Sequence, residues 1–165
     1  MMCYDNSEML TRLTDIMANH KLLHKTLTLT SPTQRQGSLF EQQACAFLQA
    51  QGLHLMAQNW QQPKVGELDL IMVEVGQAWS TLVFIEVRQR KRSSFGDAAL
   101  SVTASKQRKV IKTAKYFLQQ HPEYAHYDCR FDVIAYNTTD KTKTKEQLSD
   151  NQPEWLKGAF IASAW

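Results

Sequence analysis

The stretches GELDLIMV at residues 66–73 and LVFIEVR at residues 82–88 decide how this chain folds. Both are apolar and contain β-branched residues, which strands favour. The eight residues between them include Gly76 and predict an antiparallel hairpin with residues 75–80 as its loop. Polar residues interrupt these runs at few places, so we expect both faces of the sheet to be covered.

The flanking segments alternate between helical and strand patterns. The predicted elements are a helix from Ser31 or Thr33 to about Gln51, a strand at 53–60, the hairpin, a helix at 106–120 and a strand at 130–136. Gly52 is a typical residue to end the first helix, and His121-Pro122 ends the second. A strand–helix–strand crossover predicts that the third and fourth strands are parallel. The order favours an α/β (α+β) sandwich around a mixed sheet.

Three segments follow from this pattern. Residues 1–36 are expected to form an extension, with a short amphipathic helix and a tether, and residues 37–137 the domain. The segment from Arg90 to about Ser105 lacks periodicity and is predicted to be a long functional loop. Residues 138–165 are expected to form a polar linker and a C-terminal segment that docks on the domain. Its docking side chains would be Trp155, Leu156, Phe160 and Ile161.

Composition excludes several classes of protein. At 165 residues and 19.0 kDa, with 43% hydrophobic and 21% charged residues, the chain is typical of one globular domain and not of a disordered protein. No stretch approaches the roughly 20 apolar residues of a membrane helix, and the N-terminus lacks a signal-peptide pattern. The three cysteines lie far apart, which favours a reducing cytoplasm over a disulfide framework.

Positive charge is concentrated in one part of the chain. Residues 86–115 hold nine Lys or Arg against two acids, whereas the net charge of the whole chain is +3. This concentration indicates an anionic partner, although a solvated crossover helix explains it equally well. Trp60 and Trp79 could stack on bases, but we expect them to pack against the domain.

Two carboxylates are predicted to face each other in the hairpin. With the loop at 75–80, Asp69 lies opposite Glu86, and opposed residues share a face. Like charges this close need a positive partner, and a hard cation such as Mg²⁺ suits a few carboxylates. Arg88 projects from the same face, and Glu41 could reach the site if the first helix packs on that side. A register change by one residue, or a simple ion pair of Glu86 with Arg88, would remove the metal site.

The motifs around this hairpin resemble those of the uncharacterised YraN family. Besides the two stretches above, the matching features are Gly37, Glu41, Ala44, Asn59-Trp60, Phe95-Gly96, Lys106, Arg130–Val133, Trp155-Leu156 and Ala159-Phe160. The family is assigned to the PD-(D/E)XK nuclease superfamily, whose members similar to it include the archaeal Holliday-junction resolvases. The resemblance spans residues 37–160 and implies a restriction-endonuclease-like α-β-β-β-α-β core. By analogy with the resolvases alone, it also suggests a homodimer.

The resemblance also implies roles for individual residues. Asp69 and Glu86 match the two metal-binding acids, with Mg²⁺ or Mn²⁺ as the metal, and Glu41 matches an acid of the first helix near the metal. Arg88 stands where the motif has Lys. Because Arg stays protonated, it would bind a phosphate oxygen, and it is less suited than Lys to accept a proton from the attacking water. Glu41, Asp69, Glu86 and Arg88 are therefore the expected catalytic residues.

Three hypotheses follow. The first is a metal-dependent nuclease that acts on DNA, with branched DNA as a candidate substrate. Its basic side chains would bind the phosphate backbone of the DNA. These side chains would be Arg90, Lys91, Arg92, Lys106, Lys109 and Lys112. The second is a nucleic-acid-binding module of the same fold without catalysis, which Arg88 favours. The third is an interaction protein whose basic face binds another partner, because fold alone does not determine function.

Overall fold

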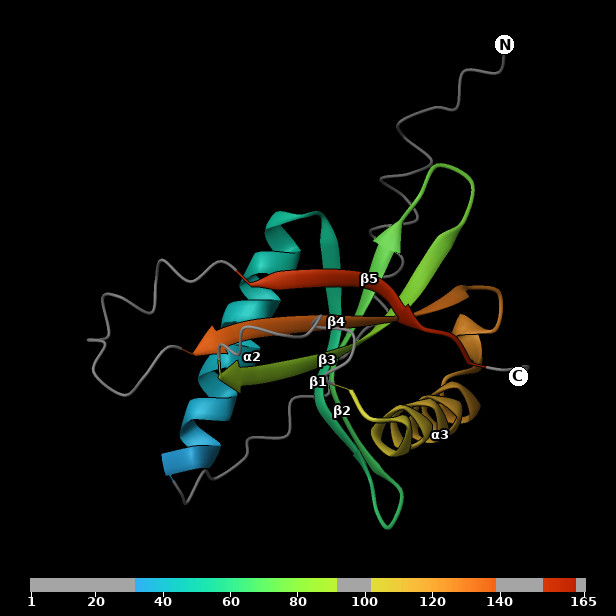
Figure 1. Cartoon of the computed structure of the whole chain (residues 1–165). Coiled ribbons are helices and arrows are strands. Elements are labelled where there is room, and N and C mark those ends of the chain that lie inside the picture. Colours follow the sequence, from blue (N-terminus) through green and yellow to red (C-terminus); the bar gives the residue numbers. More distant parts are fainter. Residues whose placement is uncertain (1–31, 92–101, 139–152, 163–165) are drawn as a thin grey trace.

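A five-stranded mixed sheet forms the centre of the protein (Figure 1). The computed structural model describes residues 32–91, 102–138 and 153–162. The strands lie in the order β1-β2-β3-β4-β5, and only β3 and β4 are parallel. The elements are α2 (Pro32–Ala50), β1 (Leu53–Gln62), β2 (Gly66–Val75), β3 (Ser80–Lys91), α3 (Ala104–Gln120), the 3₁₀ turn η2 (Pro122–Tyr124), β4 (Asp128–Thr138) and β5 (Glu154–Phe160). This confirms the predicted α+β fold with its α-β-β-β-α-β order.

The predicted register of the central hairpin is confirmed. Strands β2 and β3 pair from Leu70 with Ile85 to Val75 with Ser80, so each pair of numbers sums to 155 as expected. The backbone N–H of Gly76 donates to the carbonyl oxygen of Trp79 at 3.0 Å and closes the short turn. The predicted parallel pairing is also present, because β3 and β4 run side by side along their length.

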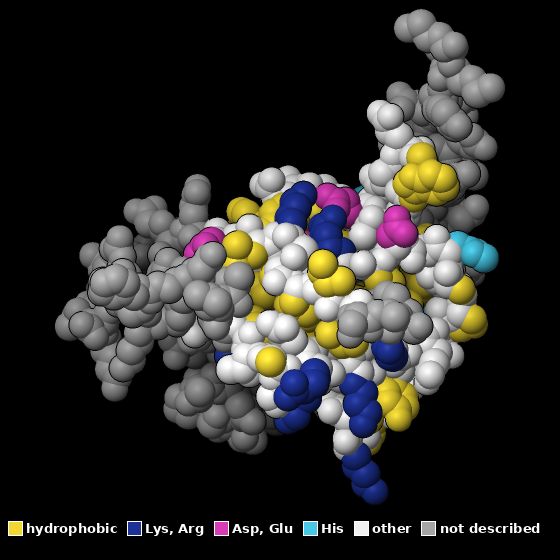
Figure 2. All heavy atoms as spheres, turned by 45° about the vertical axis from the view of Figure 1, so that its right-hand side comes forward, with side chains coloured by type: hydrophobic (Ala, Val, Ile, Leu, Met, Phe, Trp, Pro, Cys, Tyr) yellow, Lys and Arg dark blue, Asp and Glu magenta, His cyan; other side chains and the backbone are white. Residues whose placement is uncertain are grey.

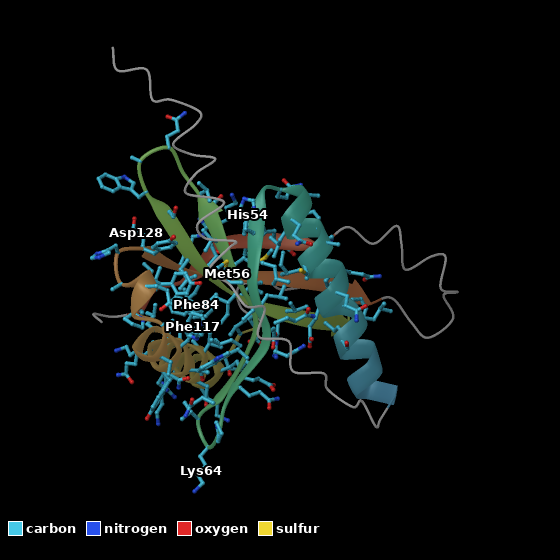
Figure 3. All side chains as sticks on the ribbon, turned by 180° about the vertical axis from the view of Figure 1, so that it is seen from behind. His54, Met56, Lys64, Phe84, Phe117 and Asp128 are labelled. Atoms are coloured by element: carbon cyan, nitrogen blue, oxygen red, sulfur yellow. The ribbon has the colours of Figure 1, made fainter. Side chains whose placement is uncertain are left out.

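The two helices cover opposite faces of the sheet (Figure 1). Helix α2 buries Phe40, Ala44 and Leu48 among side chains of one face. Helix α3 packs on the other face, where the ring centroids of Phe84 and Phe117 lie 6.1 Å apart (Figure 3). Burial on both sides explains why the strand sequences contain long apolar runs instead of alternating with polar residues.

Local signals account for the helix ends. Gly52 adopts a φ of +90°, a left-handed conformation that favours glycine, directly after α2. The side chain of Thr103 accepts a hydrogen bond of 3.3 Å from the backbone N–H of Lys106 and caps α3. Helix α2 begins at Pro32, inside the segment that we expected to be an extension. The helix expected near the N-terminus lies outside the described residues.

The C-terminal segment forms a strand that the sequence did not predict. Strand β5 pairs antiparallel with β4, and the ring of Phe160 stacks on that of Phe131. Buried Asp132 holds β5 by accepting hydrogen bonds from the indole N–H of Trp155 at 3.0 Å and the backbone N–H of Gly158 at 2.9 Å. The prediction that Ile161 docks on the domain is wrong, because its side chain is 88% exposed.

Two further expectations concern the remaining surface. Trp60 packs edge-on against Phe117 as expected, but Trp79 stands exposed at the tip of the β2–β3 hairpin, where it has no core to pack against. Strand β3 continues through Lys91, so the segment expected as a loop from Arg90 begins later than predicted, and residues 92–101 lie outside the description. None of the described helices has the length and apolar character that crossing a membrane requires.

Candidate functional site

Two buried carboxylates lie on neighbouring strands where the β2–β3 pairing ends. Asp69 and Glu86 directly follow the last backbone pair, Leu70 with Ile85, and their side chains are only 9% and 3% exposed. The backbone N–H of Val87 donates to Oδ2 of Asp69 at 2.8 Å and ties the two strands together at this point. The structure therefore brings together the two acids that the register predicted to face each other.

The environment of Asp69 opposes its ionisation. Burial is the main reason why the pKa of Asp69 rises from 3.8 to about 8, and the charge of Glu86 adds to it. The hydrogen bond from Val87 and the charge of Lys106 lower this pKa without cancelling the rise, while Glu41 raises it slightly further. At neutral pH, Asp69 thus holds a proton that a bound cation would have to displace.

The two carboxylate oxygens of Glu86 have different surroundings among the described residues: Oε1 lies near two cations, and Oε2 has no hydrogen-bond partner. Its Oε1 lies 3.0 Å from Nζ of Lys106 and 3.6 Å from Nη1 of Arg88. Burial raises the pKa of Glu86, against the effect of these two neighbours. Its Oε2 is buried and finds no hydrogen-bond partner among the described residues. Because a buried carboxylate oxygen without a partner is costly, this atom is a candidate ligand for a cation.

Lys106 belongs to this site and not only to the outer surface. We expected it to bind nucleic acid together with Lys109 and Lys112, which are indeed exposed on α3. Instead, the Lys106 side chain turns from the first turn of α3 toward Glu86 and is 26% exposed. Sequence reasoning missed this contact because it connects residues that are 20 positions apart and lie on different elements. The signal that could have indicated it is the match of Lys106 itself to the motifs of the YraN family, which sets it apart from Lys109 and Lys112.

Glu41 is the third acid expected at the site, and it lies on α2. Helix α2, which carries it, packs on the face opposite to α3, whereas Glu86 contacts α3 through Lys106. Because the charge of Glu41 nevertheless acts on Asp69, its expected place near the metal stays a prediction. Within the described residues, no three or more His, Cys, Asp or Glu side chains are grouped to hold a metal ion.

The acidic pair suits a cation that needs few protein ligands. Mg²⁺ binds in many proteins through one or two carboxylates and keeps several waters. Asp69 and Glu86 could supply these two carboxylates, since Oε2 of Glu86 has no hydrogen-bond partner in the described part of the chain. The donor set therefore fits Mg²⁺ or Mn²⁺.

Exposed cations form a basic surface beside this site. We define the basic surface as Lys64, Arg108, Lys109 and Lys112, all of which are exposed. Helix α3 carries five Lys or Arg and no acid, and dark-blue side chains gather on the lower part of the face seen in Figure 2. Lys64 was not predicted; it projects from the tip of the β1–β2 hairpin, away from the body of the protein (Figure 3).

The remaining predicted cations are at the end of β3. The backbones of Arg90 and Lys91 pair with Asn137 and Thr138 of β4, so this strand extends beyond the acidic pair. Their side chains, and all of Arg92, lie outside the described part of the chain. Their expected contact with nucleic acid stays a prediction.

These features define an α+β protein whose mixed sheet carries a buried acidic pair beside a basic helix. Residues 40–136 match the model of the uncharacterised protein family UPF0102, the YraN family, so the chain belongs to this family. A UPF0102 protein of Psychrobacter cryohalolentis is 67% identical over the full length of both chains. A UPF0102 protein of Pseudomonas putida is 42% identical over 79% of this chain and 95% of its own, and one of Francisella tularensis is 38% identical over 75% and 92%. The resemblance seen in the motifs is thus confirmed.

Proposed function

We propose that this protein is a metal-dependent nuclease that hydrolyses phosphodiester bonds of DNA. The observation that carries the proposal is the acidic pair, Asp69 and Glu86, which is buried on adjacent strands. One of its carboxylate oxygens has no hydrogen-bond partner within residues 32–91, 102–138 and 153–162. Burial opposes the ionisation of both carboxylates and so lowers the stability of the folded protein. Buried acids of this kind are typical of sites that bind a cation or catalyse a reaction. The assignment of this family to the nuclease superfamily, which rests on the resemblance, indicates the same chemistry.

Different residues of the site would bind the metal and the phosphate. Asp69 and Glu86 would hold Mg²⁺ or Mn²⁺, which when bound lowers the pKa of a water and polarises the phosphate. Arg88 reaches Glu86 at 3.6 Å and is more exposed than the acids, so its guanidinium can bind a phosphate oxygen from the solvent side. The acids lie deep and the guanidinium lies at the rim, so a DNA backbone bound by Arg88 would pass over the acidic pair.

The basic surface supports a nucleic acid as the substrate. Lys64, Arg108, Lys109 and Lys112 present positive charge from two separate elements, and α3 lacks any acid that would neutralise it. Contacts of this kind bind the phosphate backbone and carry no sequence information. The protein would therefore recognise the shape of DNA, such as a branch, and act in the cytoplasm. A homodimer, by analogy with the resolvases, stays a prediction.

A cleavage panel tests the proposal. Duplex, single-stranded and four-way branched DNA are incubated with the full chain and either Mg²⁺ or Mn²⁺, and with EDTA as the blank. Cleavage of at least one substrate is expected, and Asp69→Asn and Glu86→Gln should each abolish it while the exposed Asp128→Asn leaves it unchanged. Cleavage that persists in both variants, or no cleavage of any substrate, would refute the proposal.

The same panel examines a second candidate, a nucleic-acid-binding module without catalysis. Arg88 in place of the lysine of the motif favours this function, since an always-protonated guanidinium cannot exchange a proton with water. Under this alternative, DNA binds the wild type and both acid variants equally well, and no DNA is cut. If DNA binding is undetectable even at low salt, neither function holds, and the basic surface would serve another partner.

A further inference from the structure

Lys106 occupies a position that is electrostatically unfavourable for a cation. It lies in the first turn of α3, where the unpaired backbone N–H groups and the helix dipole favour negative charge. Its backbone cannot move away, because its N–H is bound to the cap residue Thr103. A cation at the N-terminus of a helix needs a favourable interaction elsewhere in the structure to offset this repulsion. Residues that depart from a local preference in this way are expected at functional sites.

The compensation is the acidic pair. Nζ of Lys106 lies 3.0 Å from Oε1 of Glu86, closer than the guanidinium of Arg88 at 3.6 Å, and the charge of Lys106 also acts on Asp69. Although Glu86 is nearly fully buried, the Lys106 side chain is 26% exposed. The ammonium therefore lies at the mouth of the site, in contact with Glu86 and accessible to a group that enters from solvent.

We propose that Lys106 is a catalytic residue of the site and supplies from α3 the ammonium that position 88 lacks. This inference rests on the proposed nuclease function and specifies which cation contacts the reacting phosphate. The ammonium donates a hydrogen bond to a non-bridging oxygen of the scissile phosphate, where negative charge grows as water attacks. Arg88 then binds the neighbouring backbone phosphate, and the lysines of the basic surface bind more distant ones.

The reaction balances without any change of charge on Lys106. The oxygen of water forms a bond to phosphorus, and the bond from phosphorus to one ester oxygen breaks. One proton of the water stays on the new phosphate oxygen, and the other ends on the leaving oxygen, which becomes an alcohol. A compact ammonium suits one oxygen atom at short range, whereas a broad guanidinium is suited to two oxygens of one phosphate.

The test separates catalysis from DNA binding. Single-turnover cleavage is measured with Mg²⁺, and the Kd for the same DNA is measured with Ca²⁺ in its place, for the wild type, Lys106→Gln, Lys106→Arg and the control Asp128→Asn. We expect Lys106→Gln to slow cleavage about 100-fold while Kd changes less than threefold. Lys106→Arg, which keeps a charge beside Glu86, should still slow cleavage at least tenfold. Asp128→Asn should leave both the single-turnover rate and the Kd unchanged, because this exposed residue belongs neither to the acidic pair nor to the basic surface.

A second readout does not depend on activity. The rise in melting temperature with Mn²⁺ should persist in Lys106→Gln and Lys106→Arg. It should disappear in Asp69→Asn, because the carboxylates of Asp69 and Glu86 hold the metal and the ammonium of Lys106 does not. If Lys106→Gln fails to fold, Lys106→Arg and its melting curve decide the question, since the buried Glu86 keeps a cationic partner in that variant.

Several outcomes would overturn the assignment. A wild-type rate in Lys106→Arg would make Lys106 a residue that only positions Glu86. A weaker Kd with an unchanged rate in Lys106→Gln would make it one more backbone contact. Both results leave the nuclease proposal in place. If the wild type cuts no DNA in the panel, the nuclease proposal and this inference fail together.

Discussion

Replacement of Asp69 by Asn should remove a pH dependence from the stability of the metal-free protein. Burial and the charge of Glu86 raise the pKa of Asp69 from 3.8 to about 8, so the folded protein binds a proton that the unfolded chain has released. Between these two values the folded state holds more protons, and the free energy of unfolding falls as pH rises. Asn is neutral like the protonated acid, and its amide oxygen can still accept the hydrogen bond from Val87.

The size of the effect follows from the same shift. Each pH unit in this window changes the free energy of unfolding by about 1.4 kcal/mol for one group. From pH 5 to pH 7 the wild type should therefore lose about 3 kcal/mol more than Asp69→Asn does. This is a large part of the ~5–15 kcal/mol that holds a domain together. The two proteins should be about equally stable near pH 4.

Urea denaturation in EDTA at pH 5, 6, 7 and 8 measures this difference. The exposed Asp128→Asn serves as the control, because it removes one carboxylate without changing the buried pair. We expect its stability to follow that of the wild type, while the Asp69→Asn curve diverges upward with pH. If wild type and Asp69→Asn stay parallel within about 0.5 kcal/mol, Asp69 is ionised in the folded protein at no cost and the reasoning is refuted.

Three further predictions address the fold and the basic surface. Asp132→Ala should lower the free energy of unfolding by about 3 kcal/mol in urea, because it removes the acceptor of the Trp155 indole N–H and of two hydrogen bonds from the half-buried guanidinium of Arg130, which keeps Glu74 as a partner; an unchanged midpoint would contradict this. A Cβ at Gly66 would lie 2.6 Å from Oγ1 of Thr113, so Gly66→Ala should cost about 1–3 kcal/mol, and Thr113→Ala should relieve most of this cost in the double variant; strictly additive effects would rule out the contact. Lys109→Gln and Lys112→Gln should each reduce the slope of log Kd against log salt for DNA by about one, as measured by fluorescence anisotropy, and equal slopes in all variants would exclude these lysines from the interface.

The confirmed parts of the fold are those that depend on neighbouring residues. The β2–β3 register follows from a short turn and two apolar runs, since a slip by one residue would turn buried side chains such as Leu70 and Ile85 to the other face. The C-terminal ends of α2 and α3 follow from Gly52 and from His121-Pro122, which act within one helical turn, whereas α3 begins at Ala104, two residues before the predicted start. The acidic pair was predictable because it depends only on this register.

Other features depend on contacts between distant segments. Strand β5 was missed because its pairing with β4 is stabilised by the buried carboxylate of Asp132, which gathers Trp155 and Gly158 from far along the chain. Glu41 was placed near the metal on the condition that α2 covers the face of the acids. Nothing in the pattern of α2 tells which face of a doubly covered sheet it will cover.

The amino-acid sequence by itself determined the hairpin, its register and therefore the opposition of Asp69 and Glu86, because strand pairing across a short turn is a local property. Only the tertiary structure decided which cation meets these acids. The direction in which α3 crosses the sheet brings Lys106 within 3.0 Å of Glu86 while Lys109 and Lys112 stay in solvent. The packing of one helix thus turns one of several similar lysines into part of the site, and no periodicity in the sequence distinguishes it from the others.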